Sequence, residues 1–450
     1  MDGKADEARG LSAAAQGREI AAGRLDPIAL AEAYFAAIER HPAGNLTYAR
    51  TTRTRALKEA AAARDRMRAG SMLGPLDGVP VSWKDLIDTA GTATEGGSRL
   101  CMGRTPEADG ETLRHATAAG TVCLGKTHLS ELAFSGLGLN PMAATPPNRN
   151  DARLAPGGSS SGAAASLAYD LAPLAIGSDT GGSVRIPAAW NDLVGLKTTF
   201  GLVSNKGSLS LAPSLDTIGP LARSVEDAAL GLSILTGTPA PALGSLTGGY
   251  LRLYVAEEDV VMSGLEPAVA GAFEDALRRA TQAGAQIARG PVPSFAEAER
   301  VAIEKSFAVN AEAWQVWGAK LDEQPDTVFH PIETRVRTGR EVPEEKLAAA
   351  RIEFARLSEE TAAFIREHGL LVMPTAPITA PPIARLLADE AYYTERNLMA
   401  LRNTRMANLL GLSALTLPTG TPMVGLMLVG APFAEAELIA AGAALERVLD

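Results

Sequence analysis

The sequence predicts an α/β fold in which helices cover both faces of a largely parallel or mixed β-sheet. Short apolar runs alternate with amphipathic segments along much of the chain, which is the pattern of strands joined by helical crossovers. The chain is also large enough for such a sheet, because it has 450 residues and 46% of them are hydrophobic.

The elements of the N-terminal half follow from local pattern. Residues 1–70 form a predicted helical lead-in, because Ala, Leu and Ile recur at helical spacing in 27–40 and an Ala-, Arg- and Lys-rich run covers 54–69. The segments after the lead-in predict, in order, a strand at 79–84, a helix at 110–119 ended by Gly120, a strand at 121–124 and a strand at 171–178.

We expect one domain over residues 1–450, because neither an internal repeat nor a long disordered linker divides the chain. The second half turns mostly helical and charged before apolar runs return at Leu370 and a last helix begins at Ala434. The predicted parts are the lead-in at 1–70, a core at 71–235, a helical insertion covering one layer at 261–369, and returning core strands with a C-terminal helix at 370–450.

One stretch without a charged residue, 406–434, is long enough to cross a bilayer. It also contains three prolines and several glycines, which a membrane-spanning helix tolerates poorly. We therefore expect two buried strands at 414–418 and 424–429, joined by a turn. The N-terminus is too charged for a signal peptide, so neither secretion nor membrane insertion is indicated.

Composition excludes several classes of function. The net charge of -10 and the pI near 5.2 come with no basic stripe, which argues against nucleic acid as a partner. The two cysteines, Cys101 and Cys123, predict no disulfide framework, and no Cys/His cluster has the spacing of a zinc site. We expect a cytoplasmic protein that uses no metal and no organic cofactor.

Residues 120–127 match the phosphate-loop pattern, in which the backbone amides of a glycine-rich loop wrap a phosphate. The residues between the two glycines are Thr-Val-Cys-Leu, however, and these favour a buried strand after a helix-ending glycine. A strand cannot curl around a phosphate. We therefore interpret Lys126 as a residue at the end of a strand.

Residues 158–162, Gly-Ser-Ser-Ser-Gly, match the nucleophile elbow of α/β-hydrolases. That motif needs a strand leading into the turn and a histidine later in the chain. Here Pro156 and two glycines precede it, and the later histidines, His330 and His368, lie in the helical, charged region. The elbow stays an alternative to the arrangement described next.

Three segments in fixed order carry a different set of reactive groups. The strand at 79–84 ends on Lys84, which points away from the apolar face of the strand. Residues 156–162 form a loop of glycines and serines before a helix of small residues. Residues 177–187 place Ser183 after two glycines, at a turn that leaves a strand and enters a helix.

The glycines before Ser183 let successive backbone N–H groups converge on one point, as a developing oxyanion requires, and a helix N-terminus adds a favourable potential. A serine there can attack a carbonyl only if another group removes its proton. No histidine lies in or beside these segments, which points to Lys84. A lysine with the ordinary pKa of about 10.4 is a poor base at neutral pH, but burial disfavours its charged form.

These segments resemble the amidase-signature family of serine hydrolases, and the resemblance extends over nearly the whole chain. It rests on the motifs at 74–80, 125–134, 156–162, 177–187, 195–201, 214–220 and 373–377. The family's triad consists of a lysine, a serine held in a cis peptide and a second serine. The resemblance implies the family's fold, an α/β/α sandwich with a large mixed central β-sheet.

Carried over residue by residue, the resemblance implies Lys84 as the base, Ser159 as the relay and Ser183 as the acyl-forming nucleophile. Ser159 is chosen over its two neighbours because it stands 24 residues before Ser183, as in the family. The implied oxyanion donors are the backbone N–H groups of Thr180, Gly181, Gly182 and Ser183.

Several of these residues also have plain structural interpretations. Lys84 fits a solvated lysine at a strand end. Ser160 and Ser161 are expected to bond a nearby helix N-terminus. Asp179 and Arg185 flank the predicted nucleophile and are expected to brace the turn through an ion pair or backbone hydrogen bonds.

The expected activity is hydrolysis of a carbon–nitrogen amide bond in a small-molecule substrate, giving a carboxylic acid and ammonia or an amine. The alternatives are the glutamine-cleaving subunit of an amidotransferase, which works with a partner protein, and a catalytically silent binding or scaffold member. A homodimer also stays open. Aromatic residues of the later helices are candidate pocket walls, with core packing the safer expectation: Phe307, Trp314, Trp317, Tyr392 and Tyr393.

Overall fold

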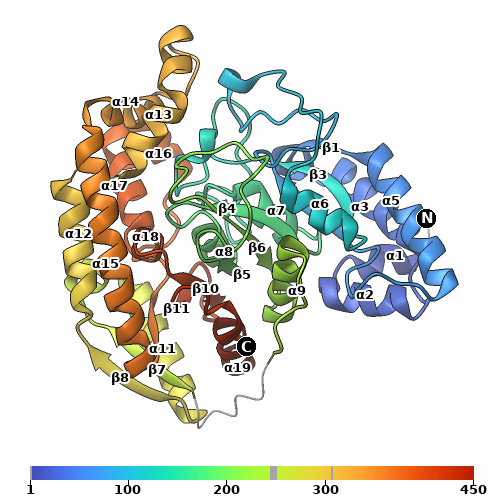
Figure 1. Cartoon of the computed structure of the whole chain (residues 1–450). Coiled ribbons are helices and arrows are strands. Elements are labelled where there is room, and N and C mark those ends of the chain that lie inside the picture. Colours follow the sequence, from blue (N-terminus) through green and yellow to red (C-terminus); the bar gives the residue numbers. More distant parts are fainter. Residues whose placement is uncertain (1–2, 244–250, 306–307, 450) are drawn as a thin grey trace.

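The computed structural model describes residues 3–243, 251–305 and 308–449, which form a mixed α/β fold around one 11-stranded sheet (Figure 1). The strands lie in the order β1-β3-β2-β4-β6-β5-β10-β11-β9-β7-β8. Their bounds are β1 Tyr48–Thr51, β2 Pro80–Lys84, β3 Val122–Thr127, β4 Ala175–Asp179, β5 Val194–Lys197, β6 Thr217–Ala222, β7 Arg252–Ala256, β8 Gln286–Gly290, β9 Leu370–Pro374, β10 Ser413–Pro418 and β11 Gly425–Gly430.

The sheet is parallel in two places and antiparallel between them. Strand β2 pairs in parallel with β3 and β4, and β7 pairs in parallel with β8 and β9. Antiparallel pairs through β6, β5, β10 and β11 connect these two parts, and β1 adds an antiparallel edge. The predicted mixed sheet is confirmed.

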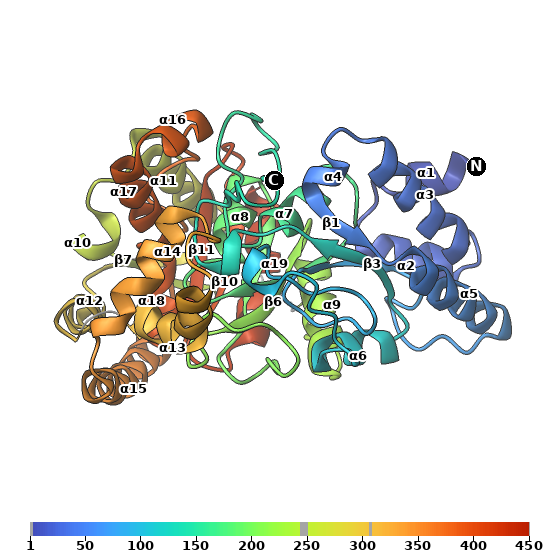
Figure 2. The ribbon, with the colours of Figure 1, turned by 90° about the horizontal axis from the view of Figure 1, so that it is seen from above.

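Helices from the N-terminal part of the chain and from residues 293–401 lie at opposite ends of the sheet. Figures 1 and 2 show α1, α3 and α5 at one end and α12 to α17 at the other. The helix bounds are α1 Gly3–Ala8, α2 Ala13–Ala21, α3 Pro27–Arg40, α4 Gly44–Thr47, α5 Arg53–Ala69, α6 Glu111–Ala118, α7 Ser161–Ala168, α8 Arg185–Trp190, α9 Val225–Thr236, α10 Asp259–Met262, α11 Pro267–Gln282, α12 Pro293–Glu304, α13 Ala308–Glu323, α14 His330–Arg337, α15 Glu344–His368, α16 Ile383–Ala388, α17 Glu390–Leu401, α18 Thr404–Leu409 and α19 Glu435–Leu449.

Alternate residues of the central strands pack on opposite faces of the sheet. Leu415 and Leu417 of β10 belong to the same buried cluster as Ile439 of α19. Ala414 of β10 and Met427 of β11 belong to a second cluster, which contains residues of α12, α15 and α18. This period of two places an apolar layer on each side of β10 and β11. Both faces are covered by helices, as predicted.

The predicted helical lead-in also contains the edge strand β1, and its helices form for local reasons. The carboxylate of Asp26 accepts hydrogen bonds from the N–H groups of Ile28 and Ala29 at 2.8 and 3.0 Å, and Pro27 occupies the first turn of α3. Helix α5 ends at Gly70, whose φ of 67° is left-handed. The helices predicted at 27–40 and 54–69 are confirmed to within one residue.

The uncharged stretch 406–434 contains β10 and β11, so the two predicted strands are confirmed to within one residue. Strand β11 is buried along its whole length and β10 along all but its last residue. No helix in the described part of the chain combines the length and the hydropathy that crossing a bilayer requires.

Strand β8 was not predicted. It lies inside the stretch 261–369 and extends the sheet beside β7, so this stretch is more than a helical cover on one layer. At the end of the strand order, β8 is mostly exposed and shows no alternation of buried and exposed side chains. The usual sequence signal of a strand is therefore missing.

Two motif matches are resolved by the backbone. Residues 122–127 form the buried strand β3, so the phosphate-loop pattern at 120–127 does not form a loop around a ligand. Lys126 lies next to the end of that strand, as interpreted. Residues 158–162 are entered from an irregular loop instead of a strand, so no nucleophile elbow forms there.

The pairing of β2 with β4 brings distant segments of the chain together. Trp83 of β2 is in register with Ile176 of β4, and both strands run in the same direction. Their carboxyl ends therefore meet at one edge of the sheet. Lys84 ends β2, and the turn that contains Ser183 follows β4.

Candidate active site

Lys84 lies at the carboxyl end of β2 with its side chain fully buried. Its Nζ donates hydrogen bonds to Oγ of Ser159 at 2.6 Å and to Oγ of Ser178 at 2.8 Å. Burial lowers the pKa of Lys84 to about 7, against the opposing influence of the Asp179 and Asp216 carboxylates. The interpretation of Lys84 as a solvated lysine is therefore wrong.

Ser159 lies in the serine loop, residues 156–162, whose last two residues begin α7. The Gly158–Ser159 peptide bond is cis, as the family resemblance implies. The carbonyl of Ser159 accepts a hydrogen bond from the N–H of Ser130 at 3.0 Å, and the N–H of Ser160 donates to the carbonyl of Ser183 at 3.1 Å. These bonds attach the serine loop to the segment after β3 and to the turn after β4.

Ser160 and Ser161 do not bond a helix N-terminus as expected. The Oγ of Ser160 donates to the carbonyl of Ser178 and accepts from its N–H, each at 3.3 Å, and so fastens the serine loop to β4. Gly177 permits this approach, because a Cβ at that position would lie 2.6 Å from the Ser160 Oγ. The Oγ of Ser161 is buried and has no hydrogen-bond partner in the described part of the chain.

Asp179 organises the glycine turn, residues 180–184, which carries Ser183. Its carboxylate accepts hydrogen bonds from Nε and Nη2 of Arg185 at 3.0 and 2.9 Å. It also accepts from the backbone N–H groups of Gly182 and Val184 at 2.8 and 3.1 Å. Burial would raise the pKa of Asp179, but Arg185, together with Lys197 and Asn408, more than offsets burial and holds this pKa well below its usual range. The predicted ion-pair brace is confirmed.

The amides of the glycine turn differ in their partners. The N–H of Gly182 is donated to Asp179, so it is not free for an oxyanion. Among the described residues, the N–H groups of Thr180, Gly181 and Ser183 have no acceptor. Three of the four amides implied by the family resemblance thus remain free to bind a negative charge.

The positions of Thr180 and Gly182 are set by contacts from later segments. The Oγ1 of Thr180 donates to the buried carboxylate of Asp216 at 2.6 Å. Gly182 has a φ of 138°, and a Cβ there would collide with the hydroxyl of Thr404 on α18. Only glycine satisfies both conditions.

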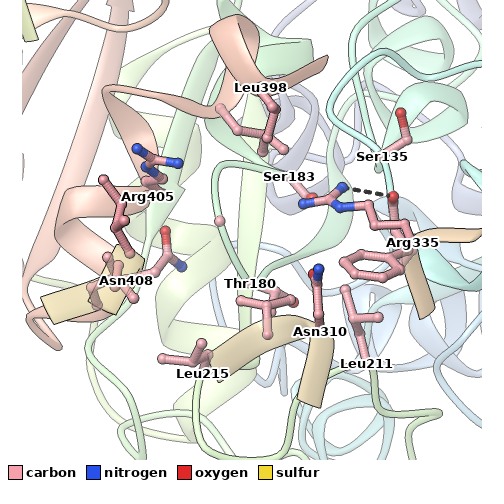
Figure 3. A pocket seen from close by; sticks show the side chains of 18 residues that line it. Ser135, Thr180, Ser183, Leu211, Leu215, Asn310, Arg335, Leu398, Arg405 and Asn408 are labelled. Carbon is pink, nitrogen blue, oxygen red and sulfur yellow. Dashed lines mark hydrogen bonds between the residues drawn. The ribbon is translucent and has the colours of Figure 1, made fainter. Parts of the chain in front are cut away.

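A cavity of about 290 Å³ opens at Ser183, between the edge of the sheet and the later helices (Figure 3). Ser183 itself is 4% exposed. The residues lining the cavity are Ala133, Phe134, Ser135, Thr180, Gly181, Ser183, Leu211, Leu215, Ala302, Ile303, Val309, Asn310, Arg335, Leu398, Leu401, Arg405, Asn408 and Leu409. They are mostly apolar and come from segments far apart in the sequence.

Core packing, the safer expectation for the aromatic candidates, is confirmed for Trp317 and Tyr393, and none of the candidates that the structure describes lines the cavity. Trp317 donates from Nε1 to the Ser210 carbonyl at 3.0 Å, and Tyr393 donates to the hydroxyl of Ser135 at 2.8 Å, so both pack in the interior. Trp314 and Tyr392 do not line the cavity either. Phe307 lies outside the described residues.

Sequence reasoning missed the polar groups that complete the site. Ser178 and Asp216 lie in motifs at 177–187 and 214–220 that were recognised, but nothing in those motifs shows that one contacts Lys84 and the other Thr180. Arg335 and Arg405 come from α14 and α18, and no local signal distinguishes them from surface arginines. In the described part of the chain, no group of three or more His, Cys, Asp or Glu is placed to hold a metal ion.

Comparisons with known proteins agree with this architecture. The Amidase family model matches residues 29–439. The 2-amino-5-chloromuconic acid deaminase of Comamonas testosteroni is 36% identical, over 88% of this chain and 87% of that protein. A glutamyl-tRNA(Gln) amidotransferase subunit of Chloroflexus aggregans is 33% identical, over 98% of this chain and 96% of that protein. A crystal structure of an amidase superposes with a TM-score of 0.86 at 29% identity, over 97% of this chain and 99% of that chain.

Proposed function

The chain belongs to the amidase family of hydrolases that act on carbon–nitrogen bonds, and we propose that it hydrolyses a linear amide through an acyl-enzyme on Ser183. One observation carries this proposal. A fully buried lysine with a pKa of about 7 lies 2.6 Å from a serine hydroxyl, in a loop that is bonded to the segment carrying Ser183. This arrangement supplies a base without histidine.

In the first step, the lone pair of neutral Lys84 accepts the proton of Ser159 while the Ser159 oxygen accepts the proton of Ser183. The Ser183 oxygen then forms a bond to the amide carbonyl carbon, and the electron pair of the carbonyl moves to its oxygen. The resulting oxyanion faces the free N–H groups of Thr180, Gly181 and Ser183. Each such donor contributes about 10²–10³-fold in rate in comparable sites.

In the second half of the reaction, the proton returns through Ser159 to the leaving nitrogen as the carbon–nitrogen bond breaks. Ammonia or an amine departs and the acyl group stays on Ser183. Water then attacks the ester, giving its proton to Ser159 and through it to Lys84. The carboxylic acid is released when the proton returns to the Ser183 oxygen, which restores the starting state.

A second candidate function is the cleavage of glutamine within an amidotransferase complex. It is supported by the Chloroflexus aggregans relative, which is by name an amidotransferase subunit. Glutamine carries an ammonium beside its carboxylate, and an ammonium at this depth needs an acidic partner. No acidic side chain lines the cavity in the described residues, which favours an amide without an ammonium.

The proposal is tested by assaying ammonia release from the purified chain alone, with aliphatic, aromatic and dicarboxylic amides and with glutamine. We expect release from at least one amide other than glutamine, and none from the Ser183→Ala protein. Release from glutamine alone, and only when a partner protein is added, would instead establish the amidotransferase function. An inactive chain whose Ser183 is not labelled by a fluorophosphonate would indicate a binding or scaffold member.

A further inference from the structure

Helix α18 contacts the glycine turn that carries Ser183. The Oγ1 of Thr404, the first residue of α18, donates to the carbonyl oxygen of Gly181 at 2.7 Å. The carbonyl of Leu401 lies farther from this hydroxyl, at 3.2 Å, and competes for the same proton. Thr404 is fully buried. Its hydroxyl therefore joins two segments that stand 223 residues apart in the chain.

Asn408, one helical turn after Thr404, contacts the residues that brace the glycine turn. Its Nδ2 donates to the backbone carbonyl and to the carboxylate of Asp179, at 3.1 and 2.9 Å. Its Oδ1 accepts from Nη2 of Arg185 at 2.6 Å. Both ends of the Asn408 amide are therefore bonded to the ion pair beneath the turn. Asn408 also lines the cavity, where Figure 3 labels it.

The contacts from α18 and Asp179 fix one peptide unit at both of its ends. In the Gly181–Gly182 peptide, the carbonyl oxygen accepts from Thr404, and the N–H donates to the Asp179 carboxylate at 2.8 Å. A peptide between two glycines meets little steric resistance to rotation, so its orientation depends on these two bonds. The N–H groups of Gly181 and Ser183 belong to the two peptides that flank it. A change in its orientation would displace both groups.

Oxyanion donors stabilise a transition state only when they are already in place as the charge develops. We propose that Thr404 is a positioning residue for this site. Its hydroxyl, with Asn408 acting through Asp179, holds the N–H groups of Gly181 and Ser183 toward the oxyanion. Thr404 does not line the cavity, so it acts through the turn without touching the substrate. This inference rests on the proposed function, because it assumes that an oxyanion forms at Ser183.

A biotinylated fluorophosphonate tests the positioning role without a known substrate. The Ser183 oxygen forms a bond to phosphorus, fluoride leaves, and the proton of Ser183 passes through Ser159 to Lys84. The phosphoryl oxygen gains negative charge in this step and needs the same N–H donors. Labelling at a series of probe concentrations separates the maximal rate, which depends on those donors, from the half-saturating concentration, which depends on non-covalent binding.

Thr404→Ala and Thr404→Ser together isolate the hydroxyl, because both lack the methyl group and they differ by one oxygen. Thr404→Ala should lower the maximal labelling rate about tenfold or more, and should change the half-saturating concentration by less than about twofold. Thr404→Ser should recover most of the rate. Thr404→Val keeps the volume of the side chain without the donor, and it carries the test if the alanine variant does not fold.

Thr121 provides the matched control. Its buried hydroxyl also donates to a backbone carbonyl, that of Ala116 at 2.9 Å, and Thr121 does not line the cavity. Thr121→Ala removes an equivalent hydrogen bond from the connection between α6 and β3. This variant should keep the wild-type labelling rate. Equal slowing in Thr121→Ala and Thr404→Ala would reduce the effect to a general loss of packing and overturn the assignment.

Three further outcomes overturn the inference. They are an unchanged maximal rate in Thr404→Ala, equal slowing in Thr404→Ala and Thr404→Ser, and a raised half-saturating concentration at an unchanged maximal rate. Ammonia release from amides separates this inference from the proposed function. A wild-type protein that is labelled on Ser183 but hydrolyses no amide contradicts only the proposed function. A wild-type protein that is not labelled on Ser183 contradicts both.

Discussion

Two lysines lie at the ends of neighbouring parallel strands and have different surroundings. Lys84 ends β2 and donates to the hydroxyls of Ser159 and Ser178. Lys126 lies next to the end of β3, with its Nζ 3.3 Å from the carboxylate of Asp85. Both side chains are fully buried. The difference between the two sites is a carboxylate in direct contact.

This difference decides what each lysine does. Burial lowers the pKa of both, but at Lys126 the adjacent Asp85 carboxylate opposes the shift through a direct contact that Lys84 lacks. The negative charges of Asp179 and Asp216 raise the pKa of Lys84, but neither carboxylate hydrogen-bonds to its Nζ. The neutral form of Lys84 is therefore accessible near pH 7. A buried lysine next to hydroxyls is a candidate base, whereas a buried lysine next to a carboxylate is half of an ion pair.

A third buried lysine shows that a lowered pKa is not sufficient. Burial, reinforced by the nearby Arg185 cation, lowers the pKa of Lys197 to about 7. Its Nζ donates to the carbonyls of Thr198 and Leu412 at 3.0 and 2.7 Å. Those acceptors have no proton to give. Of these three lysines, Lys84 alone combines the accessible neutral form with a serine relay.

Replacing Lys84 should have the largest effect. We expect Lys84→Met to lower kcat/KM by about 10²–10⁴-fold or more, because the proton of Ser183 then has no base. The variant should have the melting temperature of the wild-type protein or a higher one, because the substitution removes a buried ionisable group without leaving an unpaired charge. Steady-state kinetics measure the loss in kcat/KM, and thermal unfolding measures the melting temperature. Activity close to wild type would exclude the lysine mechanism.

Ser178 should matter less, because it holds Lys84 without taking part in proton transfer. Ser178→Ala removes one of the two hydrogen bonds of Nζ, and we expect kcat to fall about tenfold while KM stays nearly constant. Ser178→Thr, which retains a hydroxyl, is the control. A rise in KM with unchanged kcat would show that Ser178 serves substrate binding instead.

Asp216 should shift the pH dependence of the reaction. Below pH 7 the neutral fraction of Lys84 falls about tenfold per unit, so kcat/KM should fall with it. Asp216 raises the pKa of Lys84 through its negative charge. Asp216→Asn removes that charge and lowers the pKa of Lys84. The acid limb of the pH–rate profile should therefore move to lower pH, by less than about one unit. A pH–rate profile measures the limb. A shift to higher pH would contradict the assigned sign.

Lys126 should affect activity least and stability most clearly. Lys126→Met leaves the Asp85 carboxylate with Arg50 at 2.9 Å and the N–H of Glu95 at 3.3 Å as partners, so we expect a loss of about 1–3 kcal/mol in the free energy of unfolding. The folded variant should retain kcat/KM to within a few-fold. Denaturant unfolding and kinetics on the same sample separate the two effects. A loss of activity as large as that of Lys84→Met would erase the contrast between the two lysines.

Much of the fold and the core of the site could be predicted, because both rest on local patterns. An uncharged stretch broken by prolines and glycines predicted β10 and β11, and apolar residues at helical spacing predicted α3. The glycines around Ser159 and Ser183 marked the two loops, and the family resemblance related them to Lys84. The structure brings Lys84 and Ser159 to within hydrogen-bonding distance.

The rest depends on contacts between segments far apart in the chain. Asp216 meets Thr180, and Arg335 meets Phe134, across 36 and 201 residues. No spacing or composition within a single segment carries that information. Gly182 was expected to offer its amide to an oxyanion, but the Asp179 carboxylate, placed by its ion pair with Arg185, takes it.

The most direct test of the account is the rate and position of fluorophosphonate labelling, followed by peptide mass spectrometry. We expect the adduct on Ser183 in the wild-type protein, no adduct in Ser183→Ala, and labelling slowed about 10²-fold or more in Lys84→Met but not in Lys126→Met. An adduct on a different residue, or labelling of Lys84→Met at the wild-type rate, would contradict the claim that Lys84 activates Ser183.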